Sequence, residues 1–85
     1  MHAVLFSPRA LKALQSTPAS LQGRLLSATS ALAQNPRPPG CRKLAGALAG
    51  SWRIRVGFYR VLYDVDDAAR KVLITAIGPR KSVYH

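Results

Sequence analysis

WRIRVGFYRVLYDV, residues 52–65, carries the clearest secondary-structure pattern of the sequence. It begins with apolar and basic side chains in strict alternation, which is typical of a β-strand with one buried face. Gly57-Phe58 then interrupts the alternation and is a candidate for a two-residue hairpin turn. The stretch therefore predicts two antiparallel strands, over residues 52–56 and 59–65, joined by a tight turn.

This hairpin would gather three arginines on one face of the sheet. If residues 57–58 form the loop, Arg55 lies opposite Arg60, and facing residues share one side of a sheet. Arg53 lies on that side too, because side chains along a strand alternate with a period of two. The other side receives the apolar residues Trp52, Ile54, Val56, Val61 and Tyr63. We expect helices to cover the apolar face and to leave the arginine face open.

Neighbouring arginines without a carboxylate beside them favour an anionic ligand. Directly opposed like charges destabilise a sheet by tenths of a kcal/mol up to ~1 kcal/mol. Guanidinium groups keep their proton in proteins, and their planar donors match phosphate oxygens. The cluster therefore predicts a site for a backbone phosphate. The alternative is a basic strand that only prevents aggregation.

The N-terminal half carries mainly helical signals. Residues 2–6 are short and apolar and predict one strand. Ser7-Pro8 and Thr17-Pro18 each suggest an N-cap followed by proline, so one helix should start at Pro8 and a second should run from about Pro18 to Gln34. The apolar residues expected to face the core are Leu11 and Leu14 in the first helix, and Leu21, Leu25, Leu26, Ala28 and Leu32 in the second.

The rest of the chain completes an α+β arrangement. Residues 36–50 are rich in Pro, Gly and Ala and predict a loop, with a short helical turn around residues 44–48. Residues 71–77 are almost continuously apolar, which suits a strand buried on both faces, and Gly78-Pro79 should end it. We expect one domain over residues 1–85, with an antiparallel helical hairpin on one face of a mostly antiparallel, twisted, four-stranded sheet.

The charge of the chain favours a polyanionic partner. The 85 residues include 13 Lys and Arg, 3 Asp and no Glu, for a formal net charge of +10. Unpaired positive charge repels itself, and nucleic acid is the usual partner that relieves this repulsion. A solvated basic surface kept for solubility and an acidic protein partner would also fit.

Several classes of protein are disfavoured. Cys41 is the single cysteine, so an internal disulfide is impossible. The other side chains of the kind that bind zinc through nitrogen or sulfur are His2 and His85, which are too few for a zinc site, and we expect no metal and no cofactor. No segment approaches the ~20 apolar residues that cross a bilayer. The N-terminus also lacks a signal-peptide pattern. We therefore expect a cytoplasmic protein without membrane contact.

Residues 52–65, followed by IGPRKSVY at residues 77–84, resemble the C-terminal half of the RelE/ParE toxin superfamily. Lys43-Leu44 and Gly50 match the usual lead-in, and the element order agrees over nearly the whole chain. The resemblance implies a RelE-like toxin of a bacterial type II toxin–antitoxin system. Such a toxin is an mRNA interferase: an endoribonuclease that cuts messenger RNA in the ribosomal A site and so stops translation and growth. The ribose 2′-hydroxyl attacks the adjacent phosphate and leaves a cyclic phosphate.

The resemblance also implies the catalytic residues, which are Arg53, Arg55, Arg60, Arg80 and Tyr84. Arg60 and Arg80 would hold the scissile phosphate and stabilise the phosphorane. Arg53 would assist the leaving oxygen or the neighbouring phosphate. Close relatives often carry Lys where Arg55 stands, and Arg is a poor base. Either Tyr84 takes the proton, or the reaction relies on positioning and charge stabilisation.

Further positions are implied at the edge of this site. Arg42, Lys43 and Lys81 are expected to contact messenger RNA or 16S ribosomal RNA. Phe58 departs from the acidic residue that is common before the Tyr-Arg pair of the family, and Pro79 is unusual before the late arginine. Both would reshape the edge of the site.

The resemblance implies a partner and leaves other functions open. The partner is a short acidic antitoxin that covers the basic face or the sheet edge, so the free toxin should be a monomer and the complex a hetero-oligomer. A ParE-like toxin would instead bind DNA gyrase and catalyse nothing, although such members generally lack the full basic cluster. The third possibility is a non-toxic basic RNA-binding domain, for which the few aromatic residues form a poor stacking platform.

Overall fold

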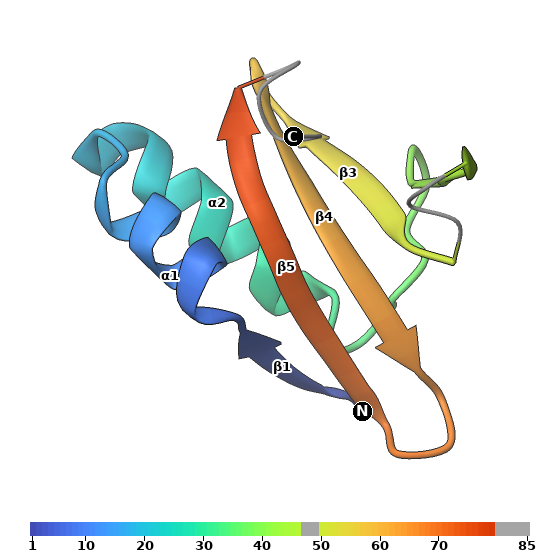
Figure 1. The fold of residues 1–85 in the computed structure, drawn as a ribbon. Helices are drawn as coiled ribbons and strands as arrows, with labels where there is room; N and C mark the ends of the chain where they lie inside the picture. Colours follow the sequence, from blue (N-terminus) through green and yellow to red (C-terminus); the bar gives the residue numbers. More distant parts are fainter. Residues whose placement is uncertain (47–49, 80–85) are drawn as a thin grey trace.

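The structure is a computed structural model that describes residues 1–46 and 50–79. In chain order the elements are β1 (Ala3–Phe6), α1 (Pro8–Gln15), α2 (Ala19–Ala31), β2 (Arg42–Lys43), β3 (Trp52–Val56), β4 (Tyr59–Asp66) and β5 (Lys71–Pro79). The strands form one sheet in the order β1-β5-β4-β3-β2, and both helices lie against one face of it (Figure 1). Only the β1–β5 pair is parallel among the described strands. The predicted α+β class is confirmed.

The β3–β4 hairpin has the predicted register. Arg55 lies opposite Arg60 across a two-residue loop. Gly57 has a φ of +60°, whereas Phe58 keeps a negative φ. A positive φ at the first loop residue alone is the pattern of a type II′ turn, whose twist matches that of the flanking strands. Glycine adopts this conformation without steric strain, so the sequence places the turn here.

One core joins the helices to the covered face of the sheet. Its buried residues are Ala10, Leu14, Leu25 and Leu32 from the helices, and Ile54, Val56, Val61, Tyr63, Val72, Ile74 and Ile77 from the strands. Tyr63 is fully buried, and its hydroxyl donates a hydrogen bond to the Pro36 carbonyl at 2.7 Å. Burial raises the pKa of Tyr63, which keeps the hydroxyl protonated for this bond. The bond fixes the segment after α2 to the centre of β4.

Ser7 caps α1, as its sequence predicts. Its hydroxyl accepts a hydrogen bond from the Ala10 amide at 3.1 Å, which satisfies one of the amides left unpaired at a helix start. The same hydroxyl donates to the Thr75 carbonyl at 3.1 Å. One side chain therefore both begins α1 and ties it to β5.

The prediction that Thr17 caps the second helix is wrong. Pro18 is the N-cap of α2 and makes no side-chain hydrogen bond. The Thr17 hydroxyl instead donates to the Leu14 carbonyl at 2.7 Å, because the short connection places it at the end of α1, where carbonyls lack helical partners. Helix α2 also ends at Ala31 rather than at Gln34.

The helical stripes are narrower than predicted. Leu14, Leu25 and Leu32 are buried, but Leu11 and Leu26 are 43% and 44% exposed. Each helix contacts the sheet along one side only, so residues at the flank of the stripe remain at the surface. No helix in the described part of the chain is long and apolar enough to cross a bilayer.

The sheet has five strands rather than four. Arg42–Lys43 was predicted as part of a loop but pairs with the start of β3 as a short edge strand. A two-residue strand carries no periodic signal, so only the pairing reveals it.

The helical turn expected around residues 44–48 falls partly outside the described residues. Strand β5 includes Gly78 and Pro79, which we predicted to lie beyond the end of a strand over residues 71–77. Proline is tolerated because, in the described part of the chain, β1 pairs only with residues 71–74 of β5.

We expect Ser7→Ala to lower the free energy of unfolding by about 1–2 kcal/mol, because it leaves the Ala10 amide and the Thr75 carbonyl without this partner. Urea unfolding measures the change. Ser16→Ala is the control, since the exposed Ser16 hydroxyl donates to the Lys12 carbonyl of the same helix. That change should stay within about 0.5 kcal/mol. Equal effects of the two substitutions would contradict the role of Ser7.

Candidate functional site

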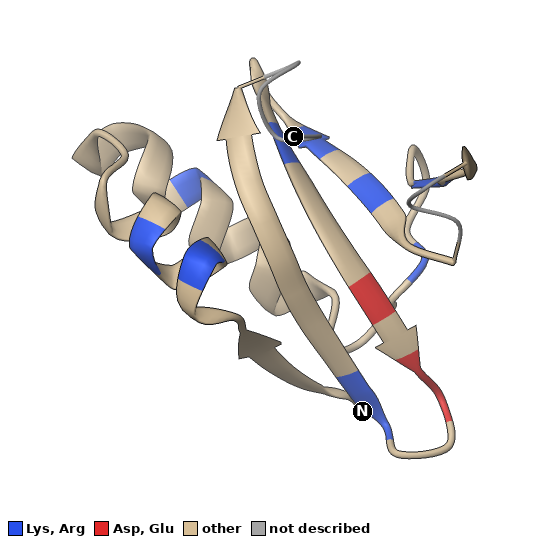
Figure 2. Cartoon of the chain, in the orientation of Figure 1, with Lys and Arg blue, Asp and Glu red and all other residues tan. Residues whose placement is uncertain are grey.

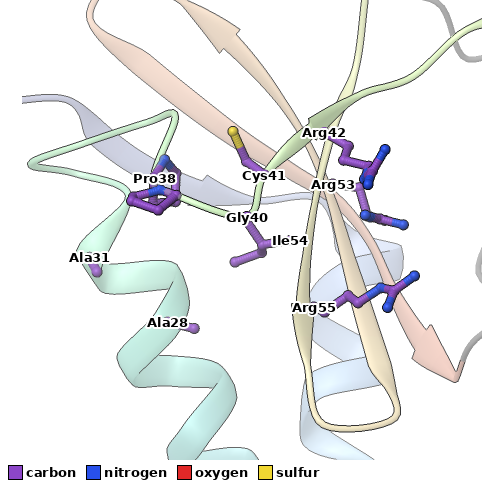
Figure 3. Close-up of a pocket in the computed structure, with 10 residues that line it drawn as sticks. Ala28, Ala31, Pro38, Gly40, Cys41, Arg42, Arg53, Ile54 and Arg55 are labelled. Atoms are coloured by element: carbon purple, nitrogen blue, oxygen red, sulfur yellow. The ribbon is translucent and has the colours of Figure 1, made fainter.

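Two cross-strand arginine pairs lie on the face of the sheet opposite the helices. Arg55 lies opposite Arg60, and Arg42 lies opposite Arg53. Arg53 and Arg55 are two positions apart in β3, so all four share one face. Figure 3 shows Arg42, Arg53 and Arg55 pointing away from Ile54, which points toward α2. The structure thus brings the three predicted strand arginines together and adds Arg42 to them. We call these four residues the arginine cluster.

The arginine face is less open than predicted. Arg53 is only 8% exposed, and Arg60 is half-buried. Leu62 and Ala76 are buried on the same face, and Leu44 packs against them. Pairing of β2 with β3 brings Leu44 over the sheet, which a loop prediction could not show. Burial beside these apolar residues limits the contact of Arg53 with water, so its charge interacts more strongly with an anion than an exposed charge does.

Arg53 carries a buried donor at the edge of a cavity. Its Nε has no hydrogen-bond partner among the described residues. Leaving a buried donor unsatisfied costs about 1–3 kcal/mol. A cavity of about 760 Å³ is bordered by Arg53, Arg42 and Arg55, and a second cavity of about 330 Å³ is bordered by Arg55 and Arg60. The arginine cluster therefore borders both cavities.

The carboxylates are engaged at the other end of the sheet. Figure 2 shows them at the end of β4 and in the turn that follows, away from the basic residues of the hairpin. Their partners are Ser51 for Asp64, the Ala69 amide for Asp66, and Arg37 and His2 for Asp67. The hydrogen bond from Arg37 lowers the pKa of Asp67 below its usual range. These acids are therefore committed to local partners rather than to the arginine cluster.

Arg24 is a further cation at the hairpin, and the sequence did not single it out. Its guanidinium lies against Gly57, where an added Cβ would be 3.5 Å from Nη1 of Arg24. Helix α2 positions this side chain, since Arg24 directly precedes the buried Leu25. The sequence showed only that this basic residue lies next to the apolar stripe of the second helix. It becomes informative only once the packing of α2 on the hairpin is known.

Lys43 lies on the opposite face from Arg42. It pairs with Trp52, and its Nζ is 5.9 Å from the centroid of the Trp52 ring. The Arg37 guanidinium lies 5.1 Å from the same centroid. Alternation along β2 thus separates two neighbouring residues that we expected to contact RNA together, and the structure does not bring Lys43 into the arginine cluster.

Three predicted site residues lie outside the part of the chain that the structure describes. They are Arg80, Lys81 and Tyr84, and their roles stay predictions. The last described residues of β5 still shape the site. Gly78 lies opposite Arg60 on the side away from Arg55. Because glycine has no side chain, nothing on β5 projects against the Arg60 guanidinium from this position.

Solved structures similar to this chain include an isolated toxin and chains of toxin–antitoxin complexes. A chain of the RelBE2 toxin–antitoxin complex from Mycobacterium tuberculosis has a TM-score of 0.83 and 28% identity, over 93% of this chain and 98% of that chain. A chain of the archaeal RelE–RelB complex from Pyrococcus horikoshii has a TM-score of 0.82 and 31% identity, over 94% and 96%. The isolated RelE toxin from E. coli has a TM-score of 0.79 and 25% identity, over 99% and 92%.

The sequence comparison agrees with these structures. No curated protein sequence matches the chain. A family model described as the ParE toxin of type II toxin–antitoxin systems, parDE, matches residues 4–84. This match spans nearly the whole chain, including every described element of the arginine face. The chain therefore belongs to the ParE toxin family of type II toxin–antitoxin systems, within the RelE/ParE toxin superfamily.

Proposed function

We propose that this protein is a ribosome-dependent endoribonuclease that stops translation by cutting messenger RNA in the A site. The observation that carries the proposal is the arginine cluster with the buried, unsatisfied Nε of Arg53. Such a group of donors suits the non-bridging oxygens of a phosphodiester, which guanidinium groups bind in pairs. RNA rather than DNA is the substrate of this reaction because the nucleophile is the ribose 2′-hydroxyl.

The reaction follows from the charge that the site can stabilise. The 2′-oxygen loses its proton and forms a bond to phosphorus, and the bond from phosphorus to the 5′-oxygen of the next nucleotide breaks. The products are a cyclic phosphate and a 5′-hydroxyl that has gained a proton. Negative charge builds on the phosphorane oxygens between these events. Arg60 and Arg53 are held by strands before substrate arrives, so they stabilise that charge without reorganising.

The described part of the site offers few groups that could transfer protons. The described residues that border the two cavities include no Asp, Glu or His. Arginine is a poor proton acceptor, so Arg55 acts as a cation beside the phosphate rather than as the base. Tyr84 is the proposed acceptor, together with Arg80 as a further phosphate ligand. Electrostatic stabilisation would then supply most of the rate.

An antitoxin is the proposed protein partner. The similar chains from M. tuberculosis and P. horikoshii come from toxin–antitoxin complexes. A formal net charge of +10 makes a small acidic protein the complementary partner for this chain. We infer that it covers the basic face or the sheet edge, forms a hetero-oligomer with the toxin, and does so in the cytoplasm.

Non-catalytic inhibition of DNA gyrase is the second candidate function. The observation that favours it is the matching family model, which is described as ParE from parDE. Direct binding to gyrase would need no phosphate site. The arginine cluster would then be an ordinary basic surface, and the buried donor of Arg53 would have no ligand.

We expect induction of this chain in a bacterium to stop growth and to create new messenger RNA ends inside translated reading frames. Arg60→Ala should reduce cleavage by about 10²–10³-fold, the usual effect of removing one oxyanion donor, while circular dichroism shows an intact fold. Lys12→Ala removes the same charge from the exposed surface of α1 and should change nothing. Stalled replication with intact transcripts would contradict the nuclease and support the gyrase function.

We expect Arg53→Met to separate stability from anion binding. The substitution removes a buried donor and keeps a long apolar side chain, so the free energy of unfolding should stay equal or rise by up to about 2 kcal/mol. Inorganic phosphate should raise the Tm of the original protein above its value in chloride at equal ionic strength, because a ligand of the native state stabilises it. That difference should shrink in the variant. A destabilised variant that keeps the full phosphate effect would contradict this role of Arg53.

A further inference from the structure

Phe58 is the most exposed large apolar side chain of the described residues. It is 90% exposed and sits in the loop between β3 and β4. Burying a phenylalanine side chain stabilises a fold by about 1.5–3 kcal/mol, and the exposed Phe58 contributes almost none of this. A single exposed apolar residue needs no explanation by itself. Its surroundings decide whether it has a role.

The turn does not require an aromatic residue at this position. Gly57 supplies the positive φ, and Phe58 adopts a negative φ that most residues reach without strain. A polar residue would satisfy the same backbone and would be better hydrated at a hairpin tip. The side chain of Phe58 is therefore free of any turn constraint, and its chemistry can be judged from what lies beside it.

Arginine residues lie near the exposed Phe58 on the hairpin. Phe58, Arg55 and Arg60 border the same cavity of about 330 Å³. From α2, the Arg24 guanidinium reaches the neighbouring Gly57. An apolar protein partner would have to desolvate these charges in order to cover the ring. A nucleotide would use both features, because its base stacks on an aromatic face and its phosphate pairs with guanidinium.

We propose that Phe58 is a base-stacking residue, whose ring takes the face of an unpaired nucleobase next to the phosphate held by Arg55 and Arg60. The inference rests on the proposed phosphate site and adds a second point of contact with single-stranded RNA. Stacking accepts any base, so Phe58 contributes affinity and placement of the strand rather than base identity. It also gives the basic hairpin the exposed aromatic platform that the sequence alone did not reveal.

The inference is tested by measuring how tightly the full chain binds a short, single-stranded RNA. The RNA is 2′-O-methylated so that it cannot be cleaved, and fluorescence anisotropy measures the binding. A series of oligonucleotides carries one abasic ribose at successive positions. Phe58→Ala should weaken binding by about 5- to 100-fold, as loss of one base stack does. Phe58→Trp should keep the affinity, and Phe58→Leu should lose it. Leu73→Ala, on an exposed apolar residue of β5, is the control and should have no effect.

The abasic series identifies the stacked base. At one position the abasic ribose should weaken binding by the original protein and leave binding by the Phe58→Ala variant unchanged, because the stack is already absent. Unchanged affinity in Phe58→Ala, full affinity in Phe58→Leu, or an equal effect of the substitution on every oligonucleotide would each overturn the inference. Arg60→Ala distinguishes failure of the stacking inference from failure of the phosphate site. If that variant binds RNA as tightly as the original protein, the proposed phosphate site itself is contradicted.

Discussion

The register of the β3–β4 hairpin determines which side chains enter the core and which form the arginine face. A slip of one residue would move every side chain of a strand to the other face. The arginines would then lie under the helices, and Ile54 and Val56 would face outward. The Gly57-Phe58 turn and the buried apolar face oppose this slip together. The core that stabilises the fold and the cluster proposed to bind phosphate are therefore fixed by the same strand pairing.

The two faces of the sheet have opposite effects on the stability of the fold. The covered face buries apolar residues from both helices, which stabilises the fold. The other face opposes like charges and buries the Nε of Arg53 without a partner among the described residues, which destabilises it. An anionic ligand would offset both costs, which is why we propose that this face binds phosphate. The strand pairing thus positions these cations without a bound ligand.

The sequence was informative where the interactions are local. The period of two in residues 52–56, the turn at Gly57 and the cap at Ser7 each depend on near neighbours, and the structure agrees with all three. It was uninformative where distant segments meet. Strand β2, the packing of Leu44 over the arginine face and the approach of Arg24 to the hairpin depend on how α2 and the following segment pack. Lys43 shows the same limit, since its face follows from the pairing of β2.

A phosphate that binds the arginine cluster should affect particular side chains, whereas a general basic surface should not distinguish among them. The most direct measurement is an NMR titration of the arginine Nε–H resonances with inorganic phosphate. We expect saturable shifts for Arg53, Arg55 and Arg60, together with little change for Arg70, an exposed arginine in the turn before β5. Equal, non-saturating shifts at all of these arginines, or none at Arg53, would contradict binding at the arginine cluster.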